Sequence, residues 1–467
     1  MMSETVQSLQ NKLQKSLQVI RMFEWLLDTY VLDFYVEENW SKLSLGWQTF
    51  FYNLNLENLT YLLEDSKVTE NELHKICPLG LLCLKVLLGK LCVSREVNQK
   101  YLDTLPRSDL LTHNKLKHVF TKCVKPKKRH ELQQMAALCK RSSDDAKVDF
   151  VVDFGAGLGH LARVLGYAYN VRVCCLEMQD SLNVQASIID DKLELLANKY
   201  LPSKDLDKFQ RPHHITLRLT ADMTAQQFIT KLKDELKLKD EDFRFGIIGL
   251  HPCGDLAPIL MRLFLNCKQA KFLNFVSCCY MKLTTALTQV DNKTYGYPLS
   301  QFLQNDKTFT NLSYEALEIS CHATETYCDR LLIGDYEYLK VHSFRAAVEK
   351  ILVKKWPSLK HCGLKSVKHV QGMEFEHYYY KAVQGLPAAE IPLEELHTSE
   401  TLTDLAQWKR VVVFYTLRLM FAPLVESIVL YDRMLFLMEN DCKVKIHAIF
   451  DPRLSPRNHI TMAIKDG

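Results

Sequence analysis

The apolar positions of the chain change period along its length. Between residues 147 and 283, short apolar runs alternate with amphipathic segments of helical spacing, which is typical of repeated β-α units. The expected strands are 148–154, 171–176, 215–219, 245–250 and 271–277. The expected helices are 181–199, 224–237 and 256–267. This pattern predicts an α/β fold with a doubly wound, Rossmann-like parallel sheet.

The two ends of the chain follow different patterns. Residues 1–120 have helical spacing and predict a helical N-terminal region before a core at 121–283. Two alternating runs, 443–450 and 459–464, flank a turn-rich segment, so 441–467 is expected to form a β-hairpin that completes a seven-stranded sheet. Residues 284–440 are then a large, mostly helical insertion, whose polar start at 288–310 we expect to form a lid.

Three glycines follow the first expected strand. Gly155, Gly157 and Gly159 remove every Cβ from the turn into the next helix, so a nucleotide-like ligand can lie against bare backbone. The second strand ends at Glu177, where open α/β sheets place the carboxylate that binds a ribose hydroxyl. The alternative is a turn whose glycines only permit close packing.

The spacing of these glycines separates two classes of cofactor. Dinucleotide sites carry G-x-G-x-x-G, whereas this loop reads Asp153-x-Gly-Ala156-Gly-x-Gly. An acid at Asp153 repels a pyrophosphate but can bind an ammonium group. The segment resembles motif I of class I S-adenosylmethionine-dependent methyltransferases, which makes an NAD-type oxidoreductase the less favoured interpretation.

Further cofactor contacts are expected after the second and third strands. Met178 follows Glu177 directly, and Asp222 is placed to accept the adenine amino group. The alternative for Asp222, equally favoured, is an N-cap of the next helix.

The chemistry of the transfer is expected after the fourth and fifth strands. His251 is a candidate for cofactor contact and general base, Asp255 for its orientation, and Tyr280 for a third catalytic group. The alternative is a Pro-Cys-Gly turn with Asp255 as an N-cap. Cys253, Cys278 and Cys279 lie beside these residues, but the chain lacks any C-x-x-C pair, and we expect no metal.

Charge and cysteine content limit the classes of partner. A net charge of +4 is too small to establish nucleic-acid binding, yet a basic cluster precedes the core. Its members are Lys122, Lys125, Lys127, Lys128, Arg129 and His130. Lys127, Lys128 and Arg129 are candidates for contacts with an RNA substrate, although a solvated helix start explains the cluster equally well. The 15 cysteines are scattered and suit a reducing compartment.

The longest apolar stretch is interrupted by charges. Residues 411–437 include Arg418, Glu426, Asp432 and Arg433, so a core helix with internal ion pairs is favoured over a membrane span. We expect a soluble protein of the cytoplasm or nucleus.

Six segments together resemble the methyltransferase-like protein 25 family, also labelled ribosomal RNA adenine dimethylase domain-containing proteins. They are Lys125–Glu131, Asp153–Gly159, His251–Leu256, Cys278–Leu283, Leu424–Glu426 and Ser455–Asn458. The resemblance covers most of the chain from about residue 120 and implies a class I methyltransferase fold that binds S-adenosylmethionine. More distantly, the chain is similar to transfer-RNA 2′-O-methyltransferases of the acceptor stem, although it lacks their cysteine/histidine zinc modules. It also lacks the N/D-P-P-Y/F motif of adenine-N6 dimethylases, where His-Pro-Cys-Gly stands instead.

The leading hypothesis is a methyltransferase that acts on RNA, with transfer RNA as one candidate and protein as the alternative substrate class. A second hypothesis is a catalytically inert scaffold of the same fold. The N-terminal helical region or the 284–440 insertion is the expected site for a protein partner.

Overall fold

The computed structural model describes residues 2–52, 54–64, 76–121, 124–239, 242–286, 296–306, 311–334 and 336–465. By its internal contacts the chain divides into two compact units. The first comprises Met1–Leu17, Val93–Leu312 and Glu426–Gly467, and the second comprises Gln18–Cys92 and Ser313–Val425. The first unit contains the sheet, and the second is helical.

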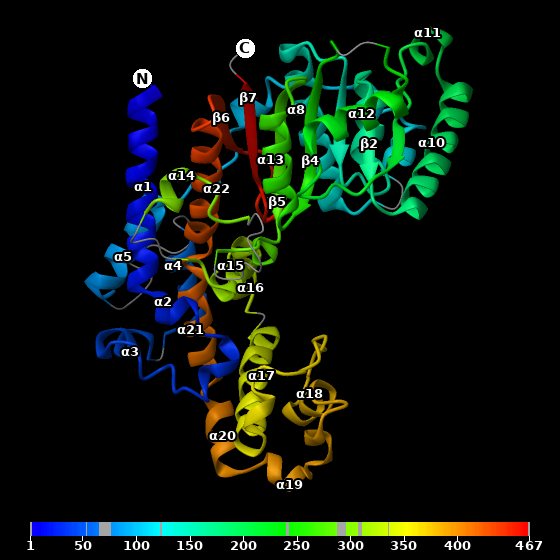
Figure 1. Cartoon of the computed structure of the whole chain (residues 1–467). Helices are drawn as coiled ribbons and strands as arrows, with labels where there is room; N and C mark the ends of the chain where they lie inside the picture. The colour runs from blue at the N-terminus through cyan, green and yellow to red at the C-terminus, as the bar shows by residue number, and fades with distance from the viewer. Residues whose placement is uncertain are drawn as a thin grey trace. The chain divides into compact units, whose positions relative to one another are not determined.

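Seven strands form one mixed sheet in the first unit (Figure 1). They are β1 (Phe150–Phe154), β2 (Val173–Glu177), β3 (His213–Thr216), β4 (Phe245–Cys253), β5 (Ala270–Cys278), β6 (Cys442–Ala448) and β7 (His459–Lys465). The order is β3-β2-β1-β4-β5-β7-β6. The first five strands are parallel, and β7 runs antiparallel to both β5 and β6. The predicted seven-stranded sheet with a C-terminal hairpin is confirmed.

Two strands, β3 and β4, end three residues away from the predicted position. β3 starts at His213 and ends at Thr216, so the expected strand at 215–219 lies too late in the chain. β4 continues beyond Leu250 to Cys253, with an irregular register against β5 between these two residues. His251 and Pro252 therefore belong to the end of the strand and not to a turn after it.

Alternate residues of the strands face two separate apolar layers, as the period of a strand requires. Val151 of β1 packs into the layer formed with α8 (Pro126–Ala146), α9 (His160–Arg163) and α10 (Asp180–Tyr200). Its neighbours Phe150 and Val152 pack into the opposite layer, with α12 (Ala225–Leu236) and α13 (Leu256–Asn266).

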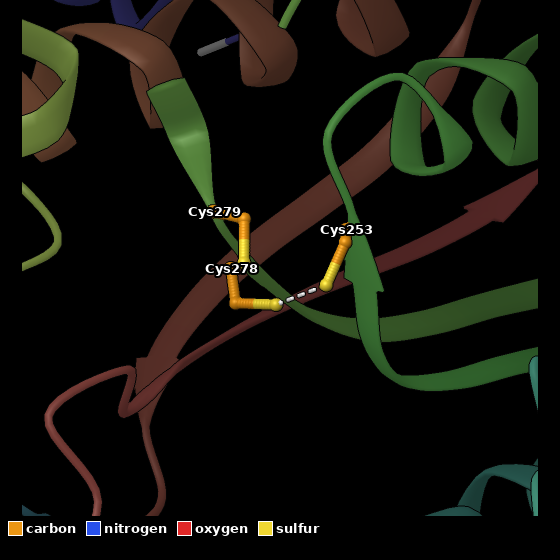
Figure 2. Close-up of side chains that lie close together, drawn as sticks. All are labelled: Cys253, Cys278 and Cys279. Atoms are coloured by element: carbon orange, nitrogen blue, oxygen red, sulfur yellow. Dashed lines mark hydrogen bonds between the residues drawn. The ribbon is translucent and has the colours of Figure 1, made fainter. Parts of the chain in front are cut away.

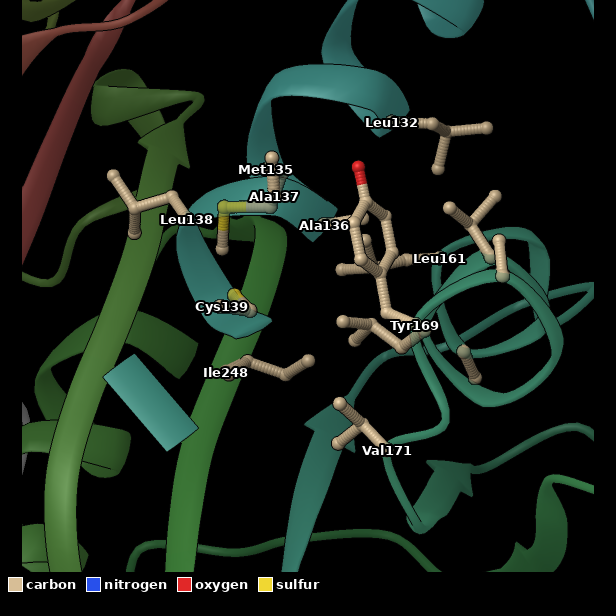
Figure 3. Packing of buried hydrophobic residues seen from close by; sticks show 14 of the residues in the cluster. Leu132, Met135, Ala136, Ala137, Leu138, Cys139, Leu161, Tyr169, Val171 and Ile248 are labelled. Atoms are coloured by element: carbon tan, nitrogen blue, oxygen red, sulfur yellow. The ribbon is translucent and has the colours of Figure 1, made fainter. Parts of the chain in front are cut away.

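The α8 side of this core is shown in Figure 3. Leu132, Met135 and Leu138 project from α8 into a cluster that includes Ile248 of β4. Pro126 opens α8 at its first position, where its fixed φ suits a helix start and its missing N–H is not needed. Burial of each large apolar side chain contributes about 1.5–3 kcal/mol. This packing fixes the start of α8 at the edge of the sheet where β4 ends.

Helices fill the chain on both sides of the core, as predicted. Before α8 these are α1 (Met2–Met22), α2 (Glu24–Leu27), α3 (Leu45–Phe51), α4 (Thr60–Leu63), α5 (Leu79–Leu91), α6 (Gln99–Leu102) and α7 (Lys117–Thr121). In the chain, α11 (Ser203–Leu206) lies between α10 and β3. Between β5 and β6 are α14 (Gln301–Gln304), α15 (Tyr314–Ile319), α16 (Thr324–Leu332), α17 (Tyr336–Lys355), α18 (Phe375–Ala382), α19 (Leu393–Leu396), α20 (Ser399–Ala406), α21 (Trp408–Leu419) and α22 (Ala422–Met438).

The lid expected at 288–310 lies partly outside the described residues. Of this segment the structure describes 296–306.

One helical stretch among the described residues, Trp408–Met438, is long and apolar enough to cross a membrane by length and composition, and 94% of its most apolar window is buried. Core helices of soluble proteins have the same character. Two of its charged residues have partners within their own units: Arg418 donates to the carbonyls of Leu26 and Leu27, and Asp432 accepts from the backbone of Leu299 and Ser300.

Candidate active site at the glycine-rich loop

The three glycines of the loop adopt left-handed backbone conformations. Their φ angles are +70°, +56° and +66° at Gly155, Gly157 and Gly159, a region that side chains with a Cβ rarely occupy. A Cβ on Gly157 would meet nothing within 4 Å, whereas a Cβ on Gly159 would lie 2.8 Å from His214 Cε1. Gly157 thus borders open space, and Gly159 is needed for close packing. The packing interpretation applies to Gly159, and the ligand-binding interpretation of Gly157 stays a prediction.

Glu177 closes the loop from the end of β2. Its Oε2 accepts a hydrogen bond from the Gly157 N–H (3.1 Å), and its Oε1 accepts one from the Gln179 N–H (3.0 Å). The side chain is almost fully buried. Each carboxylate oxygen keeps a second lone pair, so Glu177 can also accept hydroxyl donors at the open side of Gly157.

Asp153 lies one residue before the end of β1 and is 3% exposed. Burial raises the pKa of its carboxyl group to about 7, and the charge of Lys128 on α8 opposes this shift. A buried carboxyl group without a close cation is unfavourable as an anion. A ligand ammonium group would stabilise its ionised form.

A buried network of hydrogen bonds holds the backbone of the loop. Its residues were not predicted from the sequence. Arg163 of α9 is 1% exposed and donates to Asp190 Oδ1 (2.6 Å) and to the carbonyl of Leu158 (3.0 Å). Asp190 also accepts from His214 Nε2 (2.8 Å). These three residues come from α9, α10 and β3 and join the loop backbone to the sheet. Their only sequence signal is an arginine four residues after the last glycine, inside an apolar helix.

The remaining expected cofactor contacts are more exposed. Ala156 lies within the loop, with its N–H on the carbonyl of Leu176 (3.3 Å). Met178 is 59% exposed. Asp222 is also exposed and lies six residues beyond the end of β3. The N-cap of α12 is Thr224, which forms a capping box with Gln227, so the alternative N-cap role of Asp222 is wrong.

His251 is held by a residue that the sequence analysis did not single out. Its Nε2 donates to Oε1 of Glu131 on α8 (3.0 Å), which is buried and also accepts from Ser455 Oγ (2.6 Å). Burial raises the pKa of Glu131, but the hydrogen bond and charge of His251 outweigh it and lower the pKa overall. His251 itself has a φ of +70°, which is unusual for a residue with a side chain.

The two other expected catalytic groups have structural partners. Asp255 stands at the N-cap position of α13, but its carboxylate accepts from the N–H and hydroxyl of Thr284 and does not cap the helix. Tyr280 is 1% exposed, and its hydroxyl donates to Glu426 Oε1 (3.1 Å). Both side chains are thus bonded to groups other than His251, and their catalytic roles stay predictions.

Glu426 joins several segments of the first unit. It pairs with Arg95 (2.9 Å) and with Arg457 (3.2 Å) of the segment between β6 and β7. Burial would raise its pKa, but the charge of Arg457 and the bond with His459 hold the pKa well below its usual range. Direct hydrogen bonds and ion pairs therefore join four of the segments that carried the resemblance. These are the segments of Glu131, Tyr280, Glu426 and Ser455–Asn458.

Three thiols gather at the ends of β4 and β5 (Figure 2). Cys253 Sγ and Cys278 Sγ are 2.9 Å apart, and Cys279 Sγ lies within 4.8 Å of both. The hydrogen bond from Cys278 lowers the pKa of Cys253 to about 6, and the same interaction, with burial, raises that of Cys278.

The basic residues before the core lie in different environments. Lys127 is half exposed and 3.8 Å from Glu131, and Arg129 donates to the carbonyl of Val124 (2.9 Å). Lys128 acts electrostatically on both Asp153 and His160, the residues that flank the glycine loop in the chain. Lys122 lies outside the described residues.

Comparison with known proteins agrees with this architecture. Residues 127–286 match a family model described as a methyltransferase domain, from the start of α8 to just beyond β5. The probable methyltransferase-like protein 25 of Mus musculus is 24% identical over 264 residues, which are 54% of this chain and 41% of that protein. Its counterpart from Homo sapiens is 25% identical over 260 residues, 54% of this chain and 40% of that protein. The chain thus spans about two fifths of the length of these relatives.

The matched segment contains the glycine loop, Glu177 and His251, and the resemblance seen in the sequence is confirmed. The chain therefore carries a methyltransferase domain at residues 127–286 and is similar over about half of its length to methyltransferase-like protein 25.

Proposed function

We propose that the chain is an S-adenosylmethionine-dependent methyltransferase that binds its cofactor over Gly157, between Asp153 and Glu177. The observation that carries the proposal is the pair of buried carboxylates at the ends of β1 and β2, on either side of a glycine that borders open space. Ligands of open α/β sheets bind at this edge, outside the carboxyl ends of the strands.

The donor set fits the parts of this cofactor. Asp153 suits an ammonium group, because its carboxyl group is buried and the charge of Lys128 does not offset the effect of burial on its pKa. Glu177 suits a ribose diol, since its oxygens keep lone pairs beyond the two backbone bonds. Asp222 and Met178 are proposed to contact the adenine. When bound, the cofactor supplies an electrophilic methyl group on a sulfonium.

The acceptor must lose a proton as it is methylated, and His251 is the group proposed to take it. Its left-handed backbone and its hydrogen bond to buried Glu131 fix the direction of the ring at the end of β4. Glu131 is a positioning residue, and Ser455 holds it in turn. Fixed placement of such a group contributes about 10²–10⁴-fold to a rate.

RNA is the proposed class of acceptor. The support is the group of cations at the start of α8, where the charge of Lys128 acts on Asp153 and Lys127 is half exposed. Cations at the mouth of a site bind phosphates without reading sequence. Protein is the alternative acceptor, and the N-terminal helices or the 284–440 insertion are the proposed contacts for a protein partner.

Transfer of a radiolabelled methyl group tests this proposal. Purified protein is incubated with labelled S-adenosylmethionine and either total small RNA or protein extract from cells that lack the enzyme. Label in RNA that disappears with the Gly157→Val variant supports the proposal. Label found only in the protein fraction would make protein, and not RNA, the acceptor. Absence of label from both fractions would favour the hypothesis of a catalytically inert scaffold.

A further inference from the structure

Cys253, Cys278 and Cys279 form a group whose geometry the methyltransferase proposal does not use. Their three sulfur atoms lie within 4.8 Å of one another, although the residues come from two different strands (Figure 2). Cys253 ends β4, and Cys278 ends β5 directly beside it, since the two residues are register partners. Cys253 is exposed and the other two are partly exposed, so the group is open to solvent.

The backbone around the group adopts uncommon conformations. Successive side chains of a strand normally point to opposite faces, which would separate Cys278 from Cys279. Here Cys279 has a φ of +52°, which ends the alternation just after β5. His251 has a φ of +70°, two residues before Cys253. Such conformations cost about 1–3 kcal/mol each and cluster at functional sites.

Gly254 contributes to the same arrangement. Its φ is +53°, and a Cβ there would lie 2.7 Å from the carbonyl oxygen of Lys282. Only a glycine therefore lets the turn after Cys253 approach the turn after Cys279. The two turns bring the three thiols together.

We propose that Cys253, Cys278 and Cys279 bind a Zn²⁺ ion through three thiolates, with the fourth position open to an exogenous ligand. Thiolates are soft ligands that select zinc among the common divalent ions, and three protein ligands with an open position are typical of zinc sites that act on a substrate. Among the described residues, this cluster offers three ligand atoms, because the Nε2 of nearby His251 is bonded to Glu131.

The distances suit this ion after small side-chain rotations. Tetrahedral zinc with Zn–S bonds of about 2.3 Å separates its sulfurs by roughly 3.8 Å. The sulfur atoms of Cys253 and Cys278 are 2.9 Å apart, closer than this, and no pair among the three sulfurs is more than 4.8 Å apart, so rotations about the side-chain bonds can bring them to the required separation. The absence of a C-x-x-C pair, which argued against a metal in the sequence, does not apply to ligands brought together by neighbouring strands.

Metal content of the purified chain of 467 residues tests the proposal. The protein is produced with added zinc, purified under reducing conditions without chelator, and analysed by mass spectrometry of the elements. About one equivalent of zinc per chain is expected in the wild type and in Cys362→Ser, which changes an exposed thiol of the other unit. Cys253→Ser, Cys278→Ser and Cys279→Ser should each weaken binding at least tenfold, as loss of one ligand requires.

Cobalt substitution makes the test independent of how well the variants fold. Co²⁺ bound by three thiolates in the wild type should give intense thiolate-to-metal charge transfer and the visible bands of tetrahedral coordination. Added imidazole should shift these bands if the fourth position is open. Circular dichroism identifies any serine variant that has merely unfolded.

Three results would overturn the inference. The first is wild-type protein that takes up neither zinc nor cobalt after full reduction. The second is equal metal binding by the triple serine variant. The third is a Cys253–Cys278 disulfide in the purified protein, together with a failure to bind metal after this disulfide is reduced. Cofactor binding at Gly157 is measured separately, so failure of the metal site leaves the proposed methyltransferase function untouched.

Discussion

Glu177 at the end of β2 accepts the backbone N–H of Gly157, twenty residues earlier in the chain, at 3.1 Å. This single bond joins the acid expected to bind the ribose to the glycine that borders open space. The acid thus shapes the loop at the glycine that borders open space, where the cofactor is proposed to bind. Its removal should therefore weaken cofactor binding more than loss of a ligand contact alone.

Glu177→Ala should weaken binding of S-adenosylhomocysteine about 10–100-fold, because charge-assisted hydrogen bonds contribute about 1.5–3 kcal/mol each. Calorimetric titration measures the affinity. Asp191→Ala is a matched control, since this acid of α10 is 59% exposed and its ion pair with Arg211 contributes little. Equal affinities of wild type and Glu177→Ala would contradict the assignment.

Cofactor affinity should rise with pH because of Asp153. Burial places the pKa of its carboxyl group at about 7, and binding an ammonium group requires the ionised form. Below that pH the site must release a proton to bind, so affinity should increase up to about tenfold per pH unit and level off above about pH 7. Of the groups around it, Lys128 is charged, while Cys139 and Cys175 have raised pKa values and stay neutral. Affinity of Asp153→Asn should be weak and independent of pH between about pH 5.5 and 7.5.

The same raised pKa has the opposite consequence for the empty protein. The folded state binds the Asp153 proton more tightly than the unfolded state, so the contribution of Asp153 to stability is full below its usual pKa of 3.8 and is lost as pH rises through about 7. Asp153→Asn should therefore raise the thermal unfolding midpoint at pH 8 relative to the wild type. A midpoint that falls at this pH would show that the carboxylate has a stabilising partner.

Changes at His251 should lower methyl transfer far more than cofactor binding, to which the residue is expected to add one contact. His251→Ala is expected to lower kcat about 10²–10⁴-fold, and Glu131→Gln less, because the amide oxygen can still accept the bond from the ring. Steady-state kinetics with the identified acceptor and calorimetry with S-adenosylhomocysteine separate the two effects. His118→Ala, an exposed histidine of α7, serves as control. Full activity of His251→Ala would exclude its proposed role.

Glu426→Gln should destabilise the first unit by about 3–5 kcal/mol, because it leaves the cations of Arg95 and Arg457 without their buried partner. The lowered pKa of Glu426 means that its stabilisation is present above the usual pKa of 4.5 and is lost as pH falls toward the folded-state pKa. Urea unfolding monitored at several pH values measures both. Glu400→Gln, whose lysine partners lie at the surface, should change stability by less than about 1 kcal/mol.

The sequence predicted the sheet well because its strands are buried on both faces. Val151 and Val152 pack into different apolar layers, so the whole strand reads as an apolar run between clear turn residues. The glycine loop and Glu177 follow from local spacing in one β-α-β unit. Their local geometry could therefore be anticipated from the residues alone.

The missed features depend on contacts between distant segments. Glu131 contacts His251 across 120 residues, and Arg163 meets Asp190 across 27, with no local pattern to reveal either pair. The extension of β4 through Pro252 was missed because proline usually ends a strand, and here the strand has an irregular register at that point. The thiol cluster likewise requires β4 and β5 to be neighbours.

Calorimetric titration of the purified chain with S-adenosylhomocysteine, with NAD as comparator, tests the central claim most directly. We predict micromolar binding of S-adenosylhomocysteine alone, abolished in Gly157→Val, whose new side chain would fill the open space beside the loop at a strain cost of about 1–2 kcal/mol. Binding of NAD instead, or equal binding of S-adenosylhomocysteine by folded Gly157→Val, would contradict the proposed cofactor site.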